Sequence, residues 1–403
     1  MPYSASLGRP LARARSPRSW AAGIGGGSGP WHLASAEPAS PRLGLLRSRT
    51  AIDKNRAMPF DRRAMPSKRN PKPATRKVII DQDMLGPASS NLQSVAMLLN
   101  APDVEVLGIC VPTGDHWRDL QVRHALRLLE VMGRTEVPVL PGAVYPLVNH
   151  PVALAAWERL HGPLVYKGAW DLRRPGKYAD PYATPDLPEG NPKIRPSEEH
   201  AANFIVRQAR AHPGEISLWC AAPLTNVALA CRLEPHLPSL FKELHLMGGS
   251  FHPRTNDREF RHSPRREFNF RFDPEAAQIV LRGGWAHVGC APIDVSQEVK
   301  SRAEHFAAIA QSRTPTAAYF DRWGKRNRPL WDEIAAALWL DPNLATATEK
   351  CFIDVDLDRG SGYGDTLSWP PGGEPGLGES LATLYMEIDQ AKFFAMFVKL
   401  LSK

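Results

Sequence analysis

Two aspartates, Asp81 and Asp83, directly follow a short apolar run at Val78–Ile80. A Gly/Pro/Ser loop comes next, and the apolar residues beyond it recur with the i, i+3, i+4, i+7 spacing of one helix face, at Leu92, Val95, Ala96 and Leu99. The pattern predicts a strand, an acidic loop and a helix. Ligands of open α/β sheets bind just beyond the carboxyl ends of the strands, where these carboxylates are expected. Clustered carboxylate oxygens favour a hard divalent cation, Ca²⁺ or Mg²⁺, over zinc.

Polar residues also follow several later apolar runs. They are Asp115, the turn Pro223-Leu224-Thr225-Asn226, the tripeptide Glu267-Phe268-Asn269, Asp294 and the pair Trp331-Asp332. A single acid at a helix start is commonly a cap, which is the interpretation for Asp273; for Asp294 the alternative is an acid that holds a loop. The other residues all follow predicted strands, so they are expected to lie at the same edge of the sheet. Together they predict a ligand-binding site at that edge.

Strand-like and helix-like segments alternate from Lys77 onward. Apolar runs predict strands at Val104–Val111, Val137–Leu140, Ile216–Ala221, Leu244–Met247 and Ala286–Pro292. Helical spacing predicts helices at Val122–Met132, Leu154–Leu160, Thr225–Cys231, Asp273–Leu281, Ala303–Gln311, Thr316–Trp323, Asp332–Leu340 and Gln390–Leu401. The alternation predicts an α/β fold with an open, mainly parallel central sheet and helices on both faces. The stretch His161–Pro196, dense in Pro, Gly, Tyr and Trp, is expected to be a lid or insertion, and Ser197 is expected to cap the next helix.

Composition limits the class of protein. The chain has 403 residues, of which 43% are hydrophobic, and no apolar run approaches the roughly 18 residues of a membrane span. The cysteines are odd in number and widely spaced, which argues against a disulfide framework or a zinc site and favours buried thiols in a reducing cytoplasm: Cys110, Cys220, Cys231, Cys290 and Cys351.

The net charge of +8 is unevenly distributed. Residues 1–77 hold 16 Lys and Arg against three acids, a net charge of +13, whereas the remainder carries −5. Residues 1–75 are predicted to be a disordered basic extension, and residues 76–403 a single α/β domain. For the extension we favour a solvated segment, or a start codon assigned upstream of Met58 or Met65, over an arm that binds nucleic acid or a membrane surface.

Five blocks of the sequence together carry a specific resemblance. They are the strand with DQD at 81–83, PLTN at 223–226, MGG at 247–249, EFN at 267–269 with DPEAA at 273–277, and PLWDEIAAA at 329–337. In order and spacing they resemble the inosine-uridine preferring nucleoside hydrolase family over about residues 76–358. The resemblance implies an open α/β fold, one Ca²⁺ at the carboxyl edge of the sheet, hydrolysis of the N-glycosidic bond of ribonucleosides, and a homodimer or homotetramer.

The resemblance also implies roles for individual residues. Asp83 matches the aspartate that binds Ca²⁺ and acts as general base for the attacking water, and Asp81 matches a supporting acid. Thr225 matches the residue that offers its backbone carbonyl to the metal, and Asp332 matches the distal calcium-binding aspartate. A further pair, Glu267 and Asn269, matches residues that bind ribose hydroxyls.

This chain departs from the family pattern at several positions. The loop Gly86–Asn91 lacks the usual Asp-Asp pair, so that Asn91 offers an amide oxygen in place of a charged ligand, and Ca²⁺ binding is expected to be weaker. Asp115 stands where the family has an Asn that touches ribose, and it can return some of the lost charge. Trp331 replaces the His that protonates the leaving base, and it either stacks on a nucleobase or packs. The arginines of Arg254–Arg266 either meet an anionic substrate group or lie in a solvated loop.

The predicted function is therefore metal-dependent hydrolysis of a ribonucleoside, with Asp83 removing a proton from water. The sequence leaves three candidates for the leaving-group acid: His161, His262 and Tyr166. The alternative function is a non-catalytic nucleoside- or sugar-binding protein on the same scaffold, which the lost Asp-Asp pair and the lost His favour.

Overall fold

A computed structural model describes residues 75–174 and 176–403. The N-terminal extension predicted from the sequence lies outside the described residues up to position 74. No helix within the described ranges is long and apolar enough to cross a membrane.

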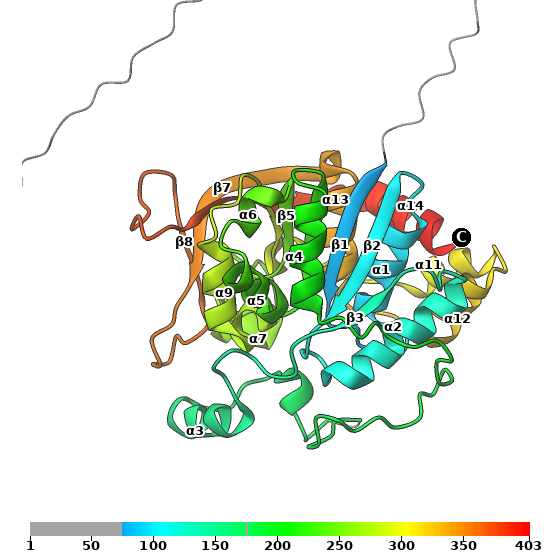
Figure 1. The fold of residues 1–403 in the computed structure, drawn as a ribbon, viewed down its shortest axis with the longest axis horizontal. Helices are drawn as coiled ribbons and strands as arrows, with labels where there is room; N and C mark the ends of the chain where they lie inside the picture. The colour runs from blue at the N-terminus through cyan, green and yellow to red at the C-terminus, as the bar shows by residue number, and fades with distance from the viewer. Residues whose placement is uncertain (1–74, 175) are drawn as a thin grey trace, which may run out of the picture. The chain divides into compact units, whose positions relative to one another are not determined.

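The described residues contain one nine-stranded sheet, in the order β3-β2-β1-β4-β5-β6-β9-β7-β8 (Figure 1). The strands from β3 to β9 in this order run parallel, whereas β7 is antiparallel to both β9 and β8. The strands are β1 (Arg76–Gln82), β2 (Val104–Val111), β3 (Val139–Pro141), β4 (Ile216–Ala221), β5 (Glu243–Met247), β6 (Val288–Ala291), β7 (Ala345–Val355), β8 (Thr366–Trp369) and β9 (Ser380–Ile388).

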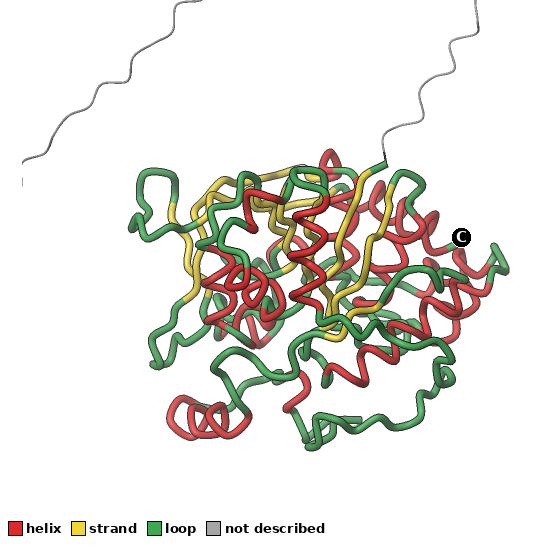
Figure 2. Tube along the Cα trace, in the orientation of Figure 1, coloured by secondary structure: helices red, strands yellow, loops and turns green. Residues whose placement is uncertain are grey.

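Helices cover both faces of the sheet (Figure 2). Alternate side chains of β1 enter the two cores: Val78 and Ile80 pack with α1, α2, α13 and α14, and Ile79 packs with α4, α5 and α9. The helices are α1 (Ser90–Asn100), α2 (Arg118–Met132), α3 (Pro151–His161), α4 (Ala201–Ala211), α5 (Thr225–Leu233), α6 (Leu237–Leu240), α7 (Arg258–His262), α8 (Phe268–Phe272), α9 (Pro274–Leu281), α10 (Ile293–Ser296), α11 (Ala303–Ala310), α12 (Pro315–Trp323), α13 (Trp331–Leu340) and α14 (Gln390–Leu401), with 3-10 turns at Gly168–Trp170 and Pro342–Leu344.

The predicted fold class is confirmed, and most predicted elements are present. One predicted helix start is wrong: α4 begins at Ala201, and its cap is His200, whose side chain accepts from the Ala202 N–H. Ser197 instead accepts a hydrogen bond from the Glu199 N–H in the preceding turn. The strands β7, β8 and β9 were not predicted, and they form an edge of the sheet.

The long connection between β3 and α4 runs along the carboxyl-end edge of the parallel strands (Figure 1). We call residues 142–200 the lid segment. A small apolar cluster attaches it to the body of the protein: Trp117, the N-cap of α2, and Phe272 from α8 pack with Leu154, Leu164 and Trp170 of the lid segment. The lid segment is therefore packed against the edge where the predicted site residues lie.

Candidate active site

Asp83 lies one residue beyond the end of β1 and is 2% exposed. Its Oδ1 accepts a hydrogen bond of 2.9 Å from the side-chain amide of Asn91, at the start of α1. Its Oδ2 accepts one of 2.7 Å from the backbone N–H of Asp115, in the loop after β2. Both oxygens are thus oriented by elements adjacent to β1 in the fold.

Gln82, between the two aspartates of the DQD motif, connects Asp83 to Asp332. Its Oε1 accepts from the Asp83 backbone N–H at 2.9 Å, and its Nε2 donates to Asp332 Oδ2 at 3.1 Å. Asp332 lies in the first turn of α13 and is 5% exposed. The structure therefore brings together Asp83 and Asp332, which are far apart in the sequence.

Four carboxylates share this region, and we call Asp83, Asp115, Glu267 and Asp332 the acidic centre. Burial, followed by the charges of Asp115 and Asp332, raises the pKa of Asp83 well above its usual range. Burial also raises the pKa of Asp332, with further contributions from Glu333, Asp115 and Glu267. Like charges at short range disfavour joint ionisation, so these carboxyls favour their neutral forms unless a positive charge is brought near them.

The lid segment supplies two groups to Asp115. The Tyr166 hydroxyl donates to Asp115 Oδ1, and Lys177 Nζ donates to the Asp115 backbone carbonyl. Burial raises the pKa of Asp115, while the positive charge of Lys177 and hydrogen bonds from Tyr166 and Asn91 oppose that rise. A predicted site residue and two lid residues therefore meet in one place.

Gly114 lets the loop after β2 approach Asp83 closely. A Cβ at this position would lie 2.2 Å from Asp83 Oδ2, far closer than any non-bonded contact allows. Glycine is required here because of this close approach.

Glu267 and Asn269 lie beyond the end of β5 and organise the start of α8. Glu267 Oε1 accepts from the Asn269 N–H at 2.8 Å, and Oε2 accepts from the N–H groups of Gly249 and Phe270 at 3.0 and 3.1 Å. The Asn269 amide donates to the Met247 carbonyl at 3.1 Å. Burial raises the pKa of Glu267 despite these backbone hydrogen bonds. The pair predicted to bind ribose is thus rigidly held at the acidic centre.

Thr225 and Asn226 occupy the turn after β4. The Thr225 hydroxyl donates to Asp273 Oδ2 at 2.6 Å, and Asp273 also caps α9 as predicted. Asn226 donates to Asp81 Oδ2 at 2.9 Å and accepts from the Ala143 N–H at 2.8 Å. Burial raises the pKa of Asp81 to about 7, against the Asn226 hydrogen bond. These contacts give Asp81 a supporting position beside Asp83.

Trp331 is anchored by its own N–H group. Its indole Nε1 donates to Gln297 Oε1 at 2.8 Å, and its ring packs against the core that contains α13. The ring is partly buried, and both interpretations drawn from the sequence, stacking on a nucleobase and packing, stay predictions. Asp294, read from the sequence as a site acid or a loop acid, holds a loop: it accepts from the backbone N–H groups of Phe251 and His252.

The three candidate leaving-group acids differ in position. His161 is exposed at the end of α3 with its ring 5.0 Å from that of Trp157, and His262 is exposed at the end of α7. Only Tyr166 reaches the acidic centre.

Sequence reasoning missed three residues at this site. Gln82 lies inside the DQD motif, and its place between the two aspartates was the signal in the sequence that could have identified it. Lys177 lies in an aperiodic segment that gives no indication of its position. Arg271 is buried beneath the lid segment, where its guanidinium donates to the Tyr166 carbonyl at 2.8 Å.

The donor atoms of the centre suit a hard divalent cation. Carboxylate and amide oxygens are the ligands that Ca²⁺ and Mg²⁺ take, and the mutual repulsion of Asp83 and Asp332 is relieved by positive charge. Within residues 75–174 and 176–403, no group of three or more His, Cys, Asp or Glu side chains is placed to hold a metal ion. The chemical type of the donors suits a cation between Asp83 and Asp332, for which neutral oxygens would have to supply the remaining ligands.

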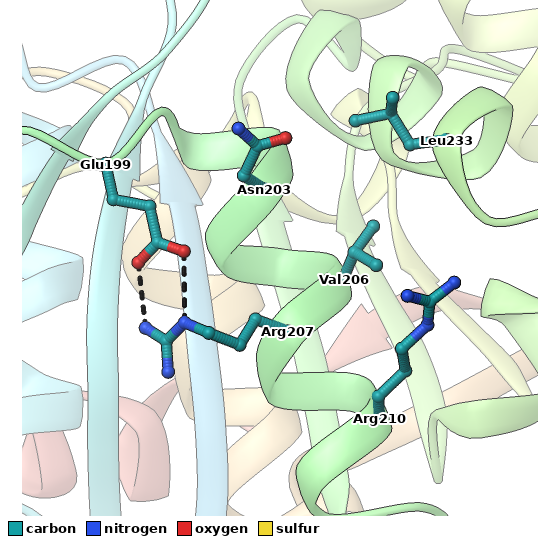
Figure 3. Close-up of a pocket in the computed structure, with 6 residues that line it drawn as sticks. All are labelled: Glu199, Asn203, Val206, Arg207, Arg210 and Leu233. Atoms are coloured by element: carbon teal, nitrogen blue, oxygen red, sulfur yellow. Dashed lines mark hydrogen bonds and ion pairs between the residues drawn. The ribbon is translucent and has the colours of Figure 1, made fainter.

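A separate surface groove lies along α4 (Figure 3). Glu199 and Arg207 face each other there through two hydrogen bonds of 3.0 and 2.8 Å. None of the acidic-centre residues lines this groove: its lining is Glu199, Asn203, Val206, Arg207, Arg210 and Leu233.

The sequence is similar to that of known nucleoside hydrolases. The sequence profile of the inosine-uridine preferring nucleoside hydrolases matches residues 78–395. A probable uridine nucleosidase 2 of Arabidopsis thaliana is 32% identical over 60% of this chain and 67% of its own length. The pyrimidine-specific ribonucleoside hydrolase RihA of Citrobacter koseri is 26% identical over 78% of this chain and 95% of its own.

Solved structures share the fold at lower identity. An inosine-guanosine nucleoside hydrolase superposes with a TM-score of 0.64 at 21% identity, covering 81% of this chain and 98% of its own. A plant nucleoside hydrolase, PpNRh1, gives a TM-score of 0.62 at 20% identity, covering 81% and 99%. The profile match over most of the chain, on a sheet whose carboxyl edge holds the matching acids, shows that this protein belongs to the inosine-uridine preferring nucleoside hydrolase family, hydrolases that act on N-glycosyl bonds.

Proposed function

We propose that this protein hydrolyses the N-glycosidic bond of a ribonucleoside to free base and ribose, with a divalent cation at the acidic centre and Asp83 as general base. The observation that carries the proposal is the joint burial of Asp83 and Asp332, linked through Gln82, at the carboxyl edge of the sheet. Relatives named as uridine nucleosidase and pyrimidine-specific ribonucleoside hydrolase support a nucleoside substrate.

The cation proposed is Ca²⁺, with Mg²⁺ less favoured. The residues that would hold it are Asp83, Asp332, the Thr225 carbonyl and the Asn91 amide oxygen. In the structure the Asn91 oxygen accepts from the Ser89 hydroxyl and its amide nitrogen faces Asp83, so this amide would have to turn to face the ion. When bound, such an ion supplies Lewis-acid polarisation of water and of ribose hydroxyls.

The residues of the chain then have defined tasks. Asp83 accepts a proton as water attacks the anomeric carbon, and hydrogen bonds from Asn91 and from the Asp115 backbone orient its two oxygens. Breaking the glycosidic bond builds oxocarbenium-like positive charge on the ribose. The preorganised carboxylates of Asp115 and Glu267 stabilise that charge electrostatically. Glu267 and Asn269, fixed at the start of α8, bind ribose hydroxyls.

We also propose a homodimer or homotetramer, which the family resemblance supports. The five free and mostly buried cysteines support a reducing, cytoplasmic location.

The test is turnover of a panel of ribonucleosides by the purified protein, with and without added Ca²⁺, scored as free ribose. The panel holds uridine, cytidine, inosine, adenosine, guanosine and nicotinamide riboside. Release of ribose from at least one of them supports the proposal. Absence of turnover for every member of the panel, with Ca²⁺ present, would falsify it.

The alternative is a nucleoside- or sugar-binding protein that has lost catalysis. Two departures favour it: Asn91 replaces a charged ligand, and Trp331, whose indole N–H is engaged with Gln297, replaces an acid. Calorimetry separates the two functions, because a binding protein would take up nucleoside without Ca²⁺ and leave it intact.

A further inference from the structure

Loss of the family His leaves the site without an evident group to protonate the departing base. Trp331, at that position, is not an acid, and its N–H is engaged with Gln297. The histidines proposed from the sequence, His161 and His262, are exposed, and no hydrogen bond joins either to the acidic centre within the described residues. His116 follows Asp115, but burial lowers its pKa to about 3, so it carries no cationic proton at neutral pH.

Tyr166 is held as a hydrogen-bond donor to Asp115. Its ring lies 5.0 Å from that of Phe268, the Arg174 guanidinium covers the ring at 4.8 Å, and Arg271 holds its carbonyl. Burial and the charge of Asp115 raise the pKa of the hydroxyl well above 10. Tyr166 is therefore a weak acid whose proton already has a partner.

Lys177 is the remaining proton donor that the described lid segment brings to the acidic centre. Its Nζ contacts the Asp115 carbonyl, one residue from Gly114, which itself lies against Asp83. The next residue, Tyr178, is fixed because its carbonyl accepts from the Trp117 indole at 2.7 Å. An ammonium group has three donors, and the contact with the Asp115 carbonyl uses one of them.

We propose that Lys177 is the acid that protonates the leaving base, in the place of the family His. This inference rests on the proposed hydrolysis. In the step, the water oxygen bonds to the anomeric carbon and the glycosidic C–N bond breaks, with its electron pair passing to the base nitrogen. A proton moves from Lys177 Nζ to the base, and one proton of the water moves to Asp83. Exchange with solvent then returns a proton to Lys177 and removes one from Asp83, so that one water is consumed.

The environment of Lys177 favours its role as a proton donor. Burial lowers the pKa of Lys177, although the charges of Asp115 and Asp83 oppose the shift, and a lowered pKa makes the ammonium a better proton donor. The lid segment supplies the acid, whereas the base Asp83 lies just beyond the end of β1, and both contact the backbone of Asp115. Acid and base thus come from separate elements.

The experiment compares two leaving groups in the full-length protein. Nucleosides release a base that needs a proton, whereas 4-nitrophenyl β-D-ribofuranoside releases a phenolate that leaves without one. Lys177→Met is expected to lower kcat/KM for the best nucleoside by about 10²-fold or more, the usual contribution of a general acid. The same variant is expected to hydrolyse the nitrophenyl riboside within about threefold of the wild-type rate, which also shows that it is folded.

Two further variants test whether the effect of Lys177 comes from its proton. One keeps the positive charge at position 177, and the other removes a lysine elsewhere in the lid segment. Lys177→Arg keeps the positive charge but cannot give up a proton at neutral pH, so it is expected to lose nucleoside turnover as Lys177→Met does. The control Lys167→Met removes another lid lysine, which pairs with Glu158 at 2.9 Å, and should leave both substrates unaffected.

Three results overturn the inference while leaving hydrolysis intact. They are an equal loss on both substrates in Lys177→Met, no loss on either, or wild-type nucleoside turnover in Lys177→Arg. A wild-type protein that cleaves neither substrate would overturn the proposed function, and the role of Lys177 with it.

Discussion

Gln82 donates its side-chain amide to the Asp332 carboxylate at 3.1 Å, across 250 residues of sequence. The same side chain accepts the backbone N–H of Asp83, so one buried amide connects Asp83, the proposed general base, to Asp332. Removal of either partner would leave a buried polar group unsatisfied, a cost of about 1–3 kcal/mol. The middle residue of the DQD motif therefore organises the two residues on which the proposed chemistry depends.

Replacement of Gln82 tests that organisation. We expect Gln82→Met to lower kcat/KM about 10- to 100-fold, the usual effect of removing a partner that orients a metal-binding residue. A suitable control is Gln93→Met: Gln93 is also buried, but it donates to the Ala88 carbonyl and not to the acidic centre. Steady-state kinetics beside thermal melts measure both effects, and an equal loss of activity in the two variants would contradict the assignment.

Asp83 is expected to be indispensable for turnover. Asp83→Asn keeps the size of the side chain but removes its ability to accept a proton, so kcat should fall by roughly 10³-fold. The fold should persist, because burial already disfavours the charge that the substitution removes. Ribose release and a circular dichroism melt check these two statements, and an Asp83→Asn variant with wild-type kcat would remove Asp83 from the mechanism.

Gly114 should tolerate no side chain. The Cβ of Gly114→Ala would meet Asp83 Oδ2 at 2.2 Å, so either the carboxylate or the loop must move. Misplacement by about 1 Å can cost 10²-fold in rate, and we expect a fall of that size in kcat/KM. Gly360→Ala is the control, because nothing lies within 4 Å of a Cβ there. Full activity in Gly114→Ala would show that the close approach has no functional role.

Burial of His245, in β5, makes the stability of the folded protein depend on pH. Burial lowers its pKa to about 4, while Glu243 and a backbone hydrogen bond oppose the shift. The unfolded chain therefore binds a proton near pH 6.5 that the folded chain does not, so stability falls as pH drops from about 6.5 to about 4. The loss attributable to this group is roughly 3 kcal/mol over that window.

Urea unfolding of the wild type and of His245→Gln at pH 7, 6 and 5 isolates this contribution. The difference in unfolding free energy between the two proteins should narrow or change sign as the pH falls, since only the wild type loses this term. A difference that stays constant with pH would show that His245 does not titrate as described.

The residues at strand ends could be located from the sequence because each follows a local apolar pattern. Val78–Ile80 and the stripe on α1 specify β1, its loop and the helix by short-range periodicity alone. The strand β7 was missed because its pairing with β9 is a long-range contact and its first half, from Thr346 to Lys350, is largely exposed and polar.

The lid residues could not be placed for a different reason. Tyr166 and Lys177 reach the acidic centre through an aperiodic chain fixed by tertiary contacts such as the one between Arg271 and the Tyr166 carbonyl. Trp331 shows the same limit, because its indole partner Gln297 is 34 residues away and belongs to no motif. The spacing of apolar residues in the sequence predicted where the carboxylates lie. The residues that contact these carboxylates could be identified only from the folded structure.

The central claim is cation-dependent hydrolysis at Asp83 and Asp332, and one measurement addresses it directly. Chelator-treated protein is titrated with Ca²⁺ in a calorimeter, and ribose release from the best nucleoside is followed in the same samples. We predict saturable binding with activity rising in parallel, and loss of both in Asp332→Asn. Full ribose release by metal-free protein, or Ca²⁺ binding unchanged in Asp332→Asn, would contradict the account.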